Sequence, residues 1–249
     1  MKKYAVKILN PWKRLDKRQL WQKVDAEHNR LIIAELDGLH RVIDLGCGYG
    51  SLTATLTKRG VWAVGIDSCK EIIESARTIF SDIDPSKLRV MNAEDLDFSD
   101  NALDAVVLRD SLHHLRQSAN FTKAMDEIER TIKSGGKLIV FDPQPNLVVR
   151  IARWMVGHKD PELKAREAES LLKSRGWVIE KRYYTEFFAM AASGGYVGPV
   201  LIPPGCDKLH KAIIEINRLA SVAIDKIGLG KVILWRYLIV AEFHKAPGH

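Results

Sequence analysis

Apolar residues recur along this chain in short blocks that switch between the period of a strand and the period of a helix. The predicted helices are residues 19–36, Ser51–Arg59, Lys70–Phe80 and Ala119–Lys133, and the predicted strands are Arg41–Leu45, Val61–Ile66, Leu88–Met91, Leu103–Leu108 and Lys137–Phe141. Strands that alternate with helices at this spacing indicate βαβ units. They predict an α/β fold with a parallel sheet covered by helices on both faces.

The last third of the chain has a different pattern. Residues 162–173 and 208–227 read as helices, and residues 177–186 and 232–243 read as strands. The later helix carries an apolar stripe at helical spacing, formed by Leu209, Ile213, Ile216, Ala220, Ala223 and Ile227. Residues 187–205 are rich in Gly, Pro and apolar side chains. No repeat or clear linker interrupts the chain, so we expect a single domain over residues 1–249.

Charge changes this picture at one end of the chain. The formal net charge is +7, and residues 1–18 hold seven basic side chains and one acidic one, which accounts for most of the excess. Such an arm suits nucleic acid, an anionic membrane surface or an acidic substrate, or it is simply a solvated terminus. No apolar run is long enough to span a bilayer, and no secretory signal is visible. Three cysteines without a CxxC pair then predict reduced thiols and a cytoplasmic protein.

The stretch "VIDLGCGYGSLT" (residues 42–53) carries the first chemical signal. Asp44 ends an apolar strand, and Gly46, Gly48 and Gly50 follow at alternate positions before a predicted helix. Glycines permit positive φ and let a ligand lie against bare backbone, and the free N–H groups of a helix N-terminus suit an anionic group. A tight turn alone would also explain them.

The next strand ends in Asp67, 21 residues after Gly46. An acid near this spacing can hold the hydroxyls of a ribose, although Asp67 could instead cap the following helix. The glycine spacing departs from the dinucleotide fingerprint, which needs Gly or Ala where Ser51 stands, and a Walker loop is absent.

Several ordered motifs together resemble the class I S-adenosylmethionine-dependent methyltransferases, in the branch that includes ubiquinone/menaquinone-biosynthesis C-methyltransferases. Besides the glycine motif and Asp67, the similar segments are "NAEDLDF" (92–98), "LDAVVLRDSLHHL" (103–115) and "IKSGGKLIVFDP" (132–143). The resemblance implies a Rossmann-like, seven-stranded, mostly parallel sheet. It also implies S-adenosylmethionine as cofactor and S-adenosylhomocysteine as product.

The resemblance also implies which residues bind the cofactor. Asn92 stands where an aspartate often contacts the adenine amino group. The backbone near Ala93 and the side chain of Glu94 or Asp95 are expected near the adenine, and the Arg109 backbone is expected near the methionine amino group. The full predicted set is Asp44, Gly46, Cys47, Gly48, Gly50, Asp67, Ser68, Asn92, Ala93, Glu94 and Arg109.

Methyl transfer from a sulfonium is an in-line displacement, so a base is needed only when the acceptor atom loses a proton. His113, His114 and Arg109 follow the fourth strand and are the candidate catalytic residues. Alternatively, the histidines cap the turn or pack on the sheet, and Arg109 pairs with Asp110. No metal-ligand cluster is visible, and we expect no metal.

Two insertions, residues 146–165 and 187–230, are expected to form a helical cap over the acceptor, with residues 1–38 as arm and helix and 39–145 as cofactor core. The cap candidates are Arg150, Arg153, Trp154, Met155, His158, Phe187, Phe188, Met190 and Tyr196. Taken singly, each of these side chains is explained by ordinary packing in the core. Together they suggest a small amphipathic acceptor such as a quinone precursor, lipid or polycycle.

Other readings stay open at this point. An RNA acceptor would use the basic arm, although no D/N-P-P-Y or Pro-Cys motif of nucleobase methylases is present. A catalytically silent adenosylmethionine-binding module would bind without turnover. A monomer, a homodimer and peripheral membrane contact are all compatible with the sequence.

Overall fold

The computed structural model describes residues 18–155, 157, 161–195 and 200–245. The chain divides into two compact units, and each is assembled from three separate stretches of sequence. The first unit is Met1–Leu31, Gln144–Asp160 and Tyr183–Tyr237, and the second is Ile32–Pro143, Pro161–Arg182 and Leu238–His249. Both predicted insertions fall mainly in the first unit. The single domain and its internal boundaries stay a prediction.

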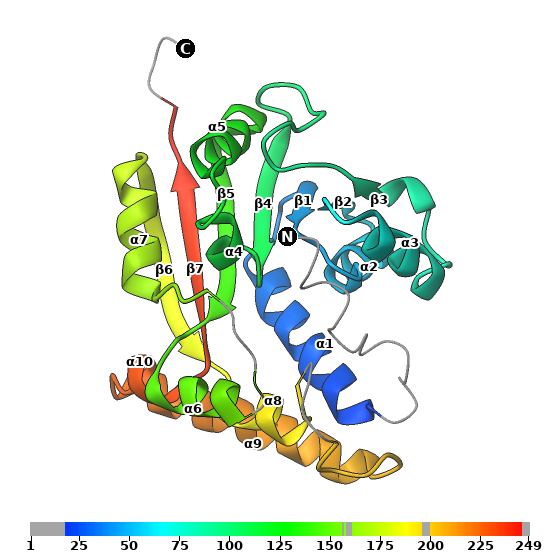
Figure 1. Cartoon of the computed structure of the whole chain (residues 1–249), viewed down its shortest axis with the longest axis vertical. Helices are drawn as coiled ribbons and strands as arrows, with labels where there is room; N and C mark the ends of the chain where they lie inside the picture. The colour runs from blue at the N-terminus through cyan, green and yellow to red at the C-terminus, as the bar shows by residue number, and fades with distance from the viewer. Residues whose placement is uncertain (1–17, 156, 158–160, 196–199, 246–249) are drawn as a thin grey trace. The chain divides into compact units, whose positions relative to one another are not determined.

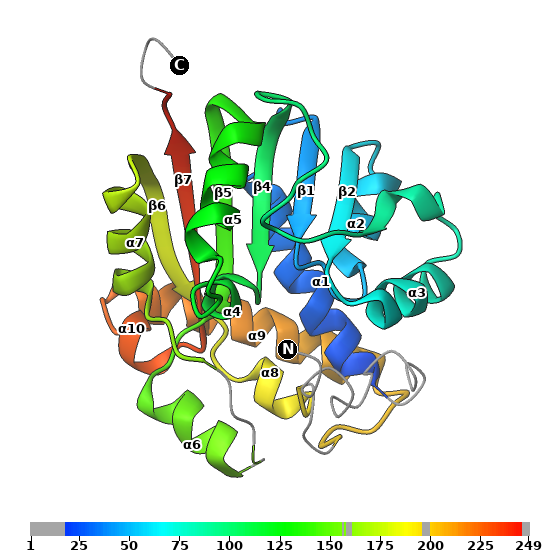
Figure 2. The same ribbon diagram turned by 45° about the horizontal axis from the view of Figure 1, so that its top comes forward.

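Seven strands form one sheet in the order β3-β2-β1-β4-β5-β7-β6 (Figures 1 and 2). The strands are β1 (Arg41–Leu45), β2 (Trp62–Asp67), β3 (Leu88–Val90), β4 (Leu103–Arg109), β5 (Ile132–Pro143), β6 (Trp177–Thr185) and β7 (Arg236–Phe243). The first five pair in parallel, whereas β7 runs antiparallel to its neighbours β5 and β6. The predicted seven-stranded, mostly parallel α/β sheet is therefore confirmed.

The sheet places the carboxyl ends of β1 and β4 next to each other. The chain moves outward from β1 through β2 to β3 and then returns to β4, so the strand order reverses between β1 and β4. In open α/β sheets, ligands bind at the carboxyl ends of the strands near such a reversal. Val42, Ile43, Val106 and Val107 are fully buried, as expected for central strands covered on both faces.

The helices of the second unit connect these strands. They are α2 (Ser51–Lys58), α3 (Lys70–Ile79), the 3-10 turn η2 (Pro85–Lys87), α4 (Leu112–Leu115), α5 (Phe121–Thr131) and α7 (Ala165–Ser174). In α5, Ala124, Met125 and Ile128 repeat at helical spacing and are buried, which is the amphipathic pattern the sequence predicts. The predicted helix Ala119–Lys133 is two residues too long at each end.

The strand that follows α5 begins earlier than its apolar run indicates. β5 starts at Ile132 and includes Gly135 and Gly136, whereas the sequence predicts only Lys137–Phe141. A Cβ on Gly136 would lie 3.1 Å from the Asp104 carbonyl oxygen, so glycine lets β5 approach β4 closely here. The pairing of the two strands is irregular between Leu103 and Ala105. The sequence prediction ended the preceding helix at Lys133 and began the strand at Lys137, so it missed the irregular start of the strand.

The first unit is mainly helical in its described residues. It contains most of α1 (Gln19–Ala34), together with α6 (Leu147–Met155), α8 (Ala189–Ala192), α9 (Asp207–Lys226) and α10 (Gly230–Ile233). Its core cluster is Leu20, Trp21, Val24, Ala189, Met190, Ile213 and Ile214. No helix in the described ranges is long and apolar enough to cross a bilayer. The strand predicted for residues 232–243 begins only at Arg236, because Gly230–Ile233 forms the short helix α10.

Helix α9 does not bury the apolar stripe that the sequence predicts. Leu209, Ile216 and Ile227 are exposed, and the buried face carries the polar residues His210, Asn217 and Ser221 together with Ile213 and Ile214. The Asn217 Oδ1 atom accepts the backbone N–H groups of Phe187, Phe188 and Ala189 at 3.0, 2.9 and 3.1 Å. These N–H groups precede or begin α8 and would otherwise lack an intrahelical partner. The need to satisfy them fixes the orientation of α9.

Candidate cofactor site and its relatives

The loop between β1 and α2 lies at the carboxyl end of β1. Gly46, Gly48 and Gly50 have φ angles of 76°, 53° and 78°, the left-handed region that glycine adopts without strain. The N–H groups of Gly46 and Cys47 donate to the Ile66 carbonyl oxygen at 2.8 and 2.9 Å. The loop is therefore fixed to the end of β2.

The three glycines lack side chains for different reasons. A Cβ on Gly46 would collide with the Ser111 hydroxyl, and one on Gly50 would lie 2.7 Å from a methyl group of Leu88. A Cβ on Gly48 would meet no heavy atom within 4 Å. Tight packing thus explains two of the glycines, whereas the backbone at Gly48 faces open space that a ligand can enter.

Asp44 lies beneath this loop and is almost fully buried. The Thr53 hydroxyl donates to its Oδ2 atom at 2.8 Å. Burial raises the pKa of Asp44 to about 6, although the Thr53 hydrogen bond and the positive charge of Arg109 oppose the shift. Asp44 supports the loop from below. Its direct contact with a cofactor stays a prediction.

The raised pKa of Asp44 predicts a pH-dependent effect on stability. Asp44 ionises near pH 4 in the unfolded chain but only near pH 6 in the folded protein. The free energy of unfolding therefore falls as the pH rises from about 4 to about 6. Asp44→Asn keeps an acceptor for Thr53 but cannot ionise. The gain in free energy of unfolding over the wild type should be about 2 kcal/mol larger at pH 8 than at pH 4.5. Urea denaturation at both pH values measures it, with exposed Asp97→Asn as the control. If Asp44→Asn and the wild type differed by the same free energy of unfolding at both pH values, Asp44 would not be a buried carboxyl with a raised pKa.

Asp67 bridges the glycine loop and the start of α3. Its Oδ2 atom accepts the N–H of Gly48 at 3.1 Å, and its Oδ1 atom accepts the N–H of Cys69 at 2.9 Å. Burial raises the pKa of Asp67, and these two backbone bonds oppose the shift. A carboxylate has about four acceptor positions, so both oxygens can also accept ligand hydroxyls. The N-cap residue of α3 is Cys69, so Asp67 is not itself the N-cap of the helix.

Two neighbours of Asp67 have distinct environments. Burial, together with the charges of Asp44 and Asp67, raises the pKa of the Cys47 thiol well above its usual value, so Cys47 stays protonated and is a poor nucleophile. Tyr49 is half-buried, and burial with nearby Cys69 and Asp67 raises the pKa of its hydroxyl. Sequence reasoning did not single out Tyr49. Ser68, which it did, is exposed.

The segment after β3 is tied to the same edge of the sheet. The Met91 N–H donates to the Asp67 carbonyl oxygen at 3.1 Å. In the following turn Asn92 is exposed, whereas Ala93 and Glu94 are partly buried. The Glu94 carboxylate accepts a hydrogen bond from the Asn120 side chain at 3.1 Å. The residues expected near the adenine therefore follow β3, the strand that pairs with β2 beside Asp67.

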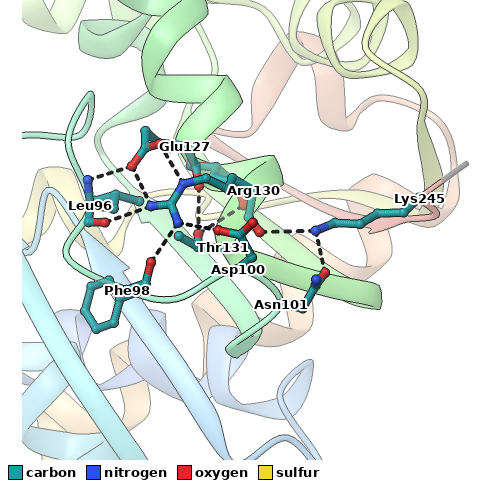
Figure 3. A network of polar contacts seen from close by, with 9 residues as sticks. Leu96, Phe98, Asp100, Asn101, Glu127, Arg130, Thr131 and Lys245 are labelled. Atoms are coloured by element: carbon teal, nitrogen blue, oxygen red, sulfur yellow. Dashed lines mark hydrogen bonds and ion pairs between the residues drawn. The ribbon is translucent and has the colours of Figure 1, made fainter. Parts of the chain in front are cut away.

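Arg130 and Glu127 on α5 hold the continuation of this segment in place (Figure 3). Arg130 donates to the carbonyl oxygens of Leu96 and Phe98 at 2.9 and 2.8 Å, and Glu127 accepts the Leu96 N–H at 2.8 Å. Arg130 also bonds Glu127 and Asp100, which lowers the pKa of Glu127. The network orders the chain between β3 and β4.

Arg130→Met should loosen this segment. The variant removes donors to two carbonyl oxygens and two carboxylates, so we expect the free energy of unfolding to fall by about 1–2 kcal/mol. Amide hydrogen exchange at Leu96 and Phe98 should accelerate. Arg166→Met, an exposed arginine on α7, is the matched control and should change neither quantity. Unchanged exchange in Arg130→Met would show that the network does not order the segment.

The segment after β4 contacts the glycine loop directly. The Ser111 hydroxyl donates to the Arg109 carbonyl oxygen at 2.8 Å and lies 3.3 Å from the Gly46 carbonyl oxygen. Asp110 adopts a left-handed φ of 54°, which is uncommon for a residue other than glycine. Its N–H donates to the Phe141 carbonyl oxygen at 3.0 Å. The chain turns sharply here and brings α4 to the loop.

Asp142 at the end of β5 is the residue that sequence reasoning missed. It is fully buried, and it accepts the N–H groups of Ser111 and His113 at 3.0 and 2.9 Å. Its Oδ2 atom also lies 3.0 Å from the His113 Nδ1 atom. The only available signal was an acid at the carboxyl end of a predicted strand, in "VFDP". Asp142 thus caps α4 and fixes His113 at the same time.

The two candidate histidines differ in their surroundings. His113 is buried beside Asp142, whereas His114 is exposed, and their ring centroids lie 4.2 Å apart. Arg109 is partly buried at the end of β4, and its positive charge acts on Asp44. Among the described residues, no group of three or more His, Cys, Asp or Glu side chains is arranged to hold a metal ion.

The predicted cap residues are divided between core and surface. Met190 belongs to the core of the first unit, Phe188 packs against that core, Phe187 contacts Phe188 edge-on, and Trp154 is exposed. Arg150 is exposed and Arg153 is partly buried. His158, Tyr196 and the Met155 side chain lie outside the described residues, as does the basic arm before Arg18.

The residues of the second unit fit an adenosyl cofactor. Bare backbone at Gly48 faces open space, and the Asp67 carboxylate lies within 3.1 Å of the Gly48 nitrogen. A nucleoside needs these two features, a close backbone approach and an acceptor for ribose hydroxyls. The α2 N-terminus follows immediately.

The comparisons with known proteins agree with this geometry. Residues 43–140 match the family described as "Methyltransferase domain". The uncharacterized methyltransferase YcgJ of Bacillus subtilis is 29% identical over 127 residues, which are 49% of each chain. A ubiquinone/menaquinone biosynthesis C-methyltransferase of Geobacter sp. is 31% identical over 127 residues, covering 48% of this chain and 53% of that protein. The chain thus spans about half the length of these curated relatives.

Solved structures extend the similarity of fold over most of the chain. A SAM-dependent methyltransferase from Archaeoglobus fulgidus has a TM-score of 0.62 at 17% identity, covering 89% of this chain and 94% of that one. The strand order, the glycine loop beside Asp67 and the matched domain agree with one another. Residues 43–140 are similar to methyltransferase domains, and the fold over most of the chain is that of S-adenosylmethionine-dependent methyltransferases.

Proposed function

We propose that this protein transfers the methyl group of S-adenosylmethionine to a small, partly apolar metabolite. The observation that carries the proposal is the open backbone at Gly48 beside the Asp67 carboxylate, in a loop that Ser111 connects to the segment after β4. The residues we propose for the cofactor and for acid–base catalysis lie at the carboxyl ends of neighbouring strands, which supports the proposal.

The cofactor supplies an electrophilic methyl group on a sulfonium, so the leaving group needs no activation by the protein. In our proposal Gly46, Gly48 and Asp67 hold the nucleoside, and the Arg109 backbone orients the amino acid end. His113 accepts the proton that the acceptor atom loses, through the ring nitrogen opposite Nδ1. Asp142 positions His113 because it accepts the His113 backbone N–H at 2.9 Å, and its negative charge 3.0 Å from Nδ1 favours a proton on that nitrogen.

The acceptor class rests on two supporting facts. One relative is named for ubiquinone/menaquinone biosynthesis, and quinones are small ring compounds with apolar substituents. The first unit combines exposed apolar side chains with an excess of basic ones, which suits an acceptor with an apolar body and a polar part.

Release of S-adenosylhomocysteine tests the proposal. The full chain is incubated with S-adenosylmethionine and, separately, with phenolic quinone precursors, sterols, ribosomal RNA or peptides. We expect acceptor-dependent release with one of the small ring compounds. Release with RNA alone would establish the runner-up function, for which the basic arm is the supporting observation. Binding of S-adenosylmethionine without release for any acceptor would support the silent binding module.

A further inference from the structure

The exposed apolar side chains of this protein are concentrated in one unit. Of the large exposed apolar residues among those described, all but Val90 and Val178 belong to the first unit. The same unit holds 18 Lys and Arg residues against 8 Asp and Glu, whereas the second unit holds 20 against 23. The first unit therefore combines apolar surface with the whole of the positive charge excess, and residues 1–18 carry +6 of its charge.

Helix α6 presents its apolar face to solvent. Leu147, Ile151 and Trp154 repeat at helical spacing and are 69%, 47% and 81% exposed. Val149, on the opposite side of the helix, is only 3% exposed. A surface helix of a globular protein normally buries its apolar stripe, and this one does the reverse. Arg150, which is exposed, and Arg153, which is partly buried, lie along one side of this apolar stripe.

Helix α9 repeats the arrangement. Its stripe of Leu209, Ile216, Leu219 and Ile227 is exposed because Asn217 turns the polar face inward. Basic side chains border the stripe: Lys208, Lys211 and Lys226 are exposed, although Lys211 pairs with Asp207 at 2.9 Å and the acidic Glu215 is exposed on the same helix. Tryptophan and leucine on one face with lysine and arginine beside them is the composition of helices that lie in a membrane interface.

Charge decides between the possible occupants of this surface. A symmetric dimer through these helices would place two strongly positive units against each other, and lysine is depleted from interfaces between proteins. Nucleic acid would satisfy the basic residues but would leave Leu147, Ile151 and Trp154 without an apolar partner. An anionic bilayer satisfies both, since its head groups are negative and its interior is apolar.

We propose that the first unit binds the surface of a membrane that contains anionic lipids. Trp154, Leu147 and Ile151 of α6 and the exposed stripe of α9 enter the interface, and the neighbouring lysines and arginines contact the head groups. This proposal uses the same exposed apolar and basic side chains that support the proposed acceptor class, but its test does not require methyl transfer.

Vesicle sedimentation of the full chain tests this proposal. Vesicles of phosphatidylcholine alone are compared with vesicles in which about one third is phosphatidylglycerol. We expect binding to the anionic vesicles only, weakened by salt. Leu147→Ser combined with Trp154→Ser should weaken binding about tenfold or more, because two exposed side chains no longer leave water. Val178→Ser in the second unit is the matched control and should bind as the wild type does.

Fluorescence quenching and light scattering complete the test. Acyl chains carrying bromine should quench the fluorescence of the wild type more than that of Trp154→Phe. No vesicle binding, equal binding to neutral vesicles, or full binding by the double serine variant would each overturn the proposal. A doubled mass in light scattering that the double serine variant abolishes would assign these helices to an interface between copies and would also overturn it.

Discussion

Asp67→Ala should abolish measurable binding of S-adenosylhomocysteine in calorimetric titration. The variant removes the proposed acceptor for two ribose hydroxyls and leaves the Gly48 and Cys69 N–H groups without their partner. Hydrogen bonds to a charged acceptor contribute roughly 1.5–3 kcal/mol each, so the loss should exceed about 100-fold in affinity. We rank this effect first because one side chain serves both the loop and the ligand.

Asp84→Ala is the matched control for that experiment. Asp84 also accepts the N–H of the residue two positions later, Ser86, at 2.9 Å, but it is exposed and precedes η2 away from the glycine loop. The control should bind S-adenosylhomocysteine like the wild type. If a folded Asp67→Ala protein kept its affinity for S-adenosylhomocysteine, the carboxylate would only shape the loop. The assignment of Asp67 to the ribose would then be wrong.

His113→Asn should lower kcat by about 10²–10⁴-fold without changing the affinity for S-adenosylhomocysteine. The effect requires an acceptor atom that loses a proton, such as a phenol oxygen, so the assay uses that type of acceptor. Asp142→Asn should also lower kcat and shift its pH profile, because an amide cannot favour the same ring tautomer. A merely structural role for Asp142 would reduce stability and leave the pH profile in place.

His114→Asn provides the comparison within the same short helix. His114 is exposed, whereas His113 is buried beside Asp142, so the His114 variant should lose far less activity than His113→Asn. Equal losses in both variants would indicate that the pair acts together. Full activity of His113→Asn on a phenol would remove His113 as the base.

The part of the fold that the sequence predicted rests on local signals. Each central strand is a short apolar run that ends near a glycine or an acid, and β1 was predicted to the residue. The left-handed conformations at Gly46, Gly48 and Gly50 are ones that glycine adopts without strain. Sequence reasoning could therefore find the glycine loop and Asp67 without knowing any tertiary contact.

The features that were missed depend on distant partners. The role of Asp142 depends on the N–H groups of Ser111 and His113, which follow the previous strand β4 and donate to its carboxylate. The orientation of α9 is set by three N–H groups some thirty residues earlier in the chain, which override its apolar pattern. In α6, a stripe of apolar residues predicts a helix face but not whether that face meets protein or solvent.

The position of β1 in the sheet affects how this protein can be synthesised. β1 pairs with β2 on one edge and with β4 on the other, where Val42 lies opposite Ala105. A ribosome completes β2 at Asp67 but must add about 40 more residues to reach the end of β4 at Arg109, which takes roughly 2–8 seconds. During that interval one edge of an apolar strand stays unpaired in the nascent chain. Slow codons between these two residues should therefore increase aggregation during expression, and a chaperone that binds extended apolar segments should reduce it.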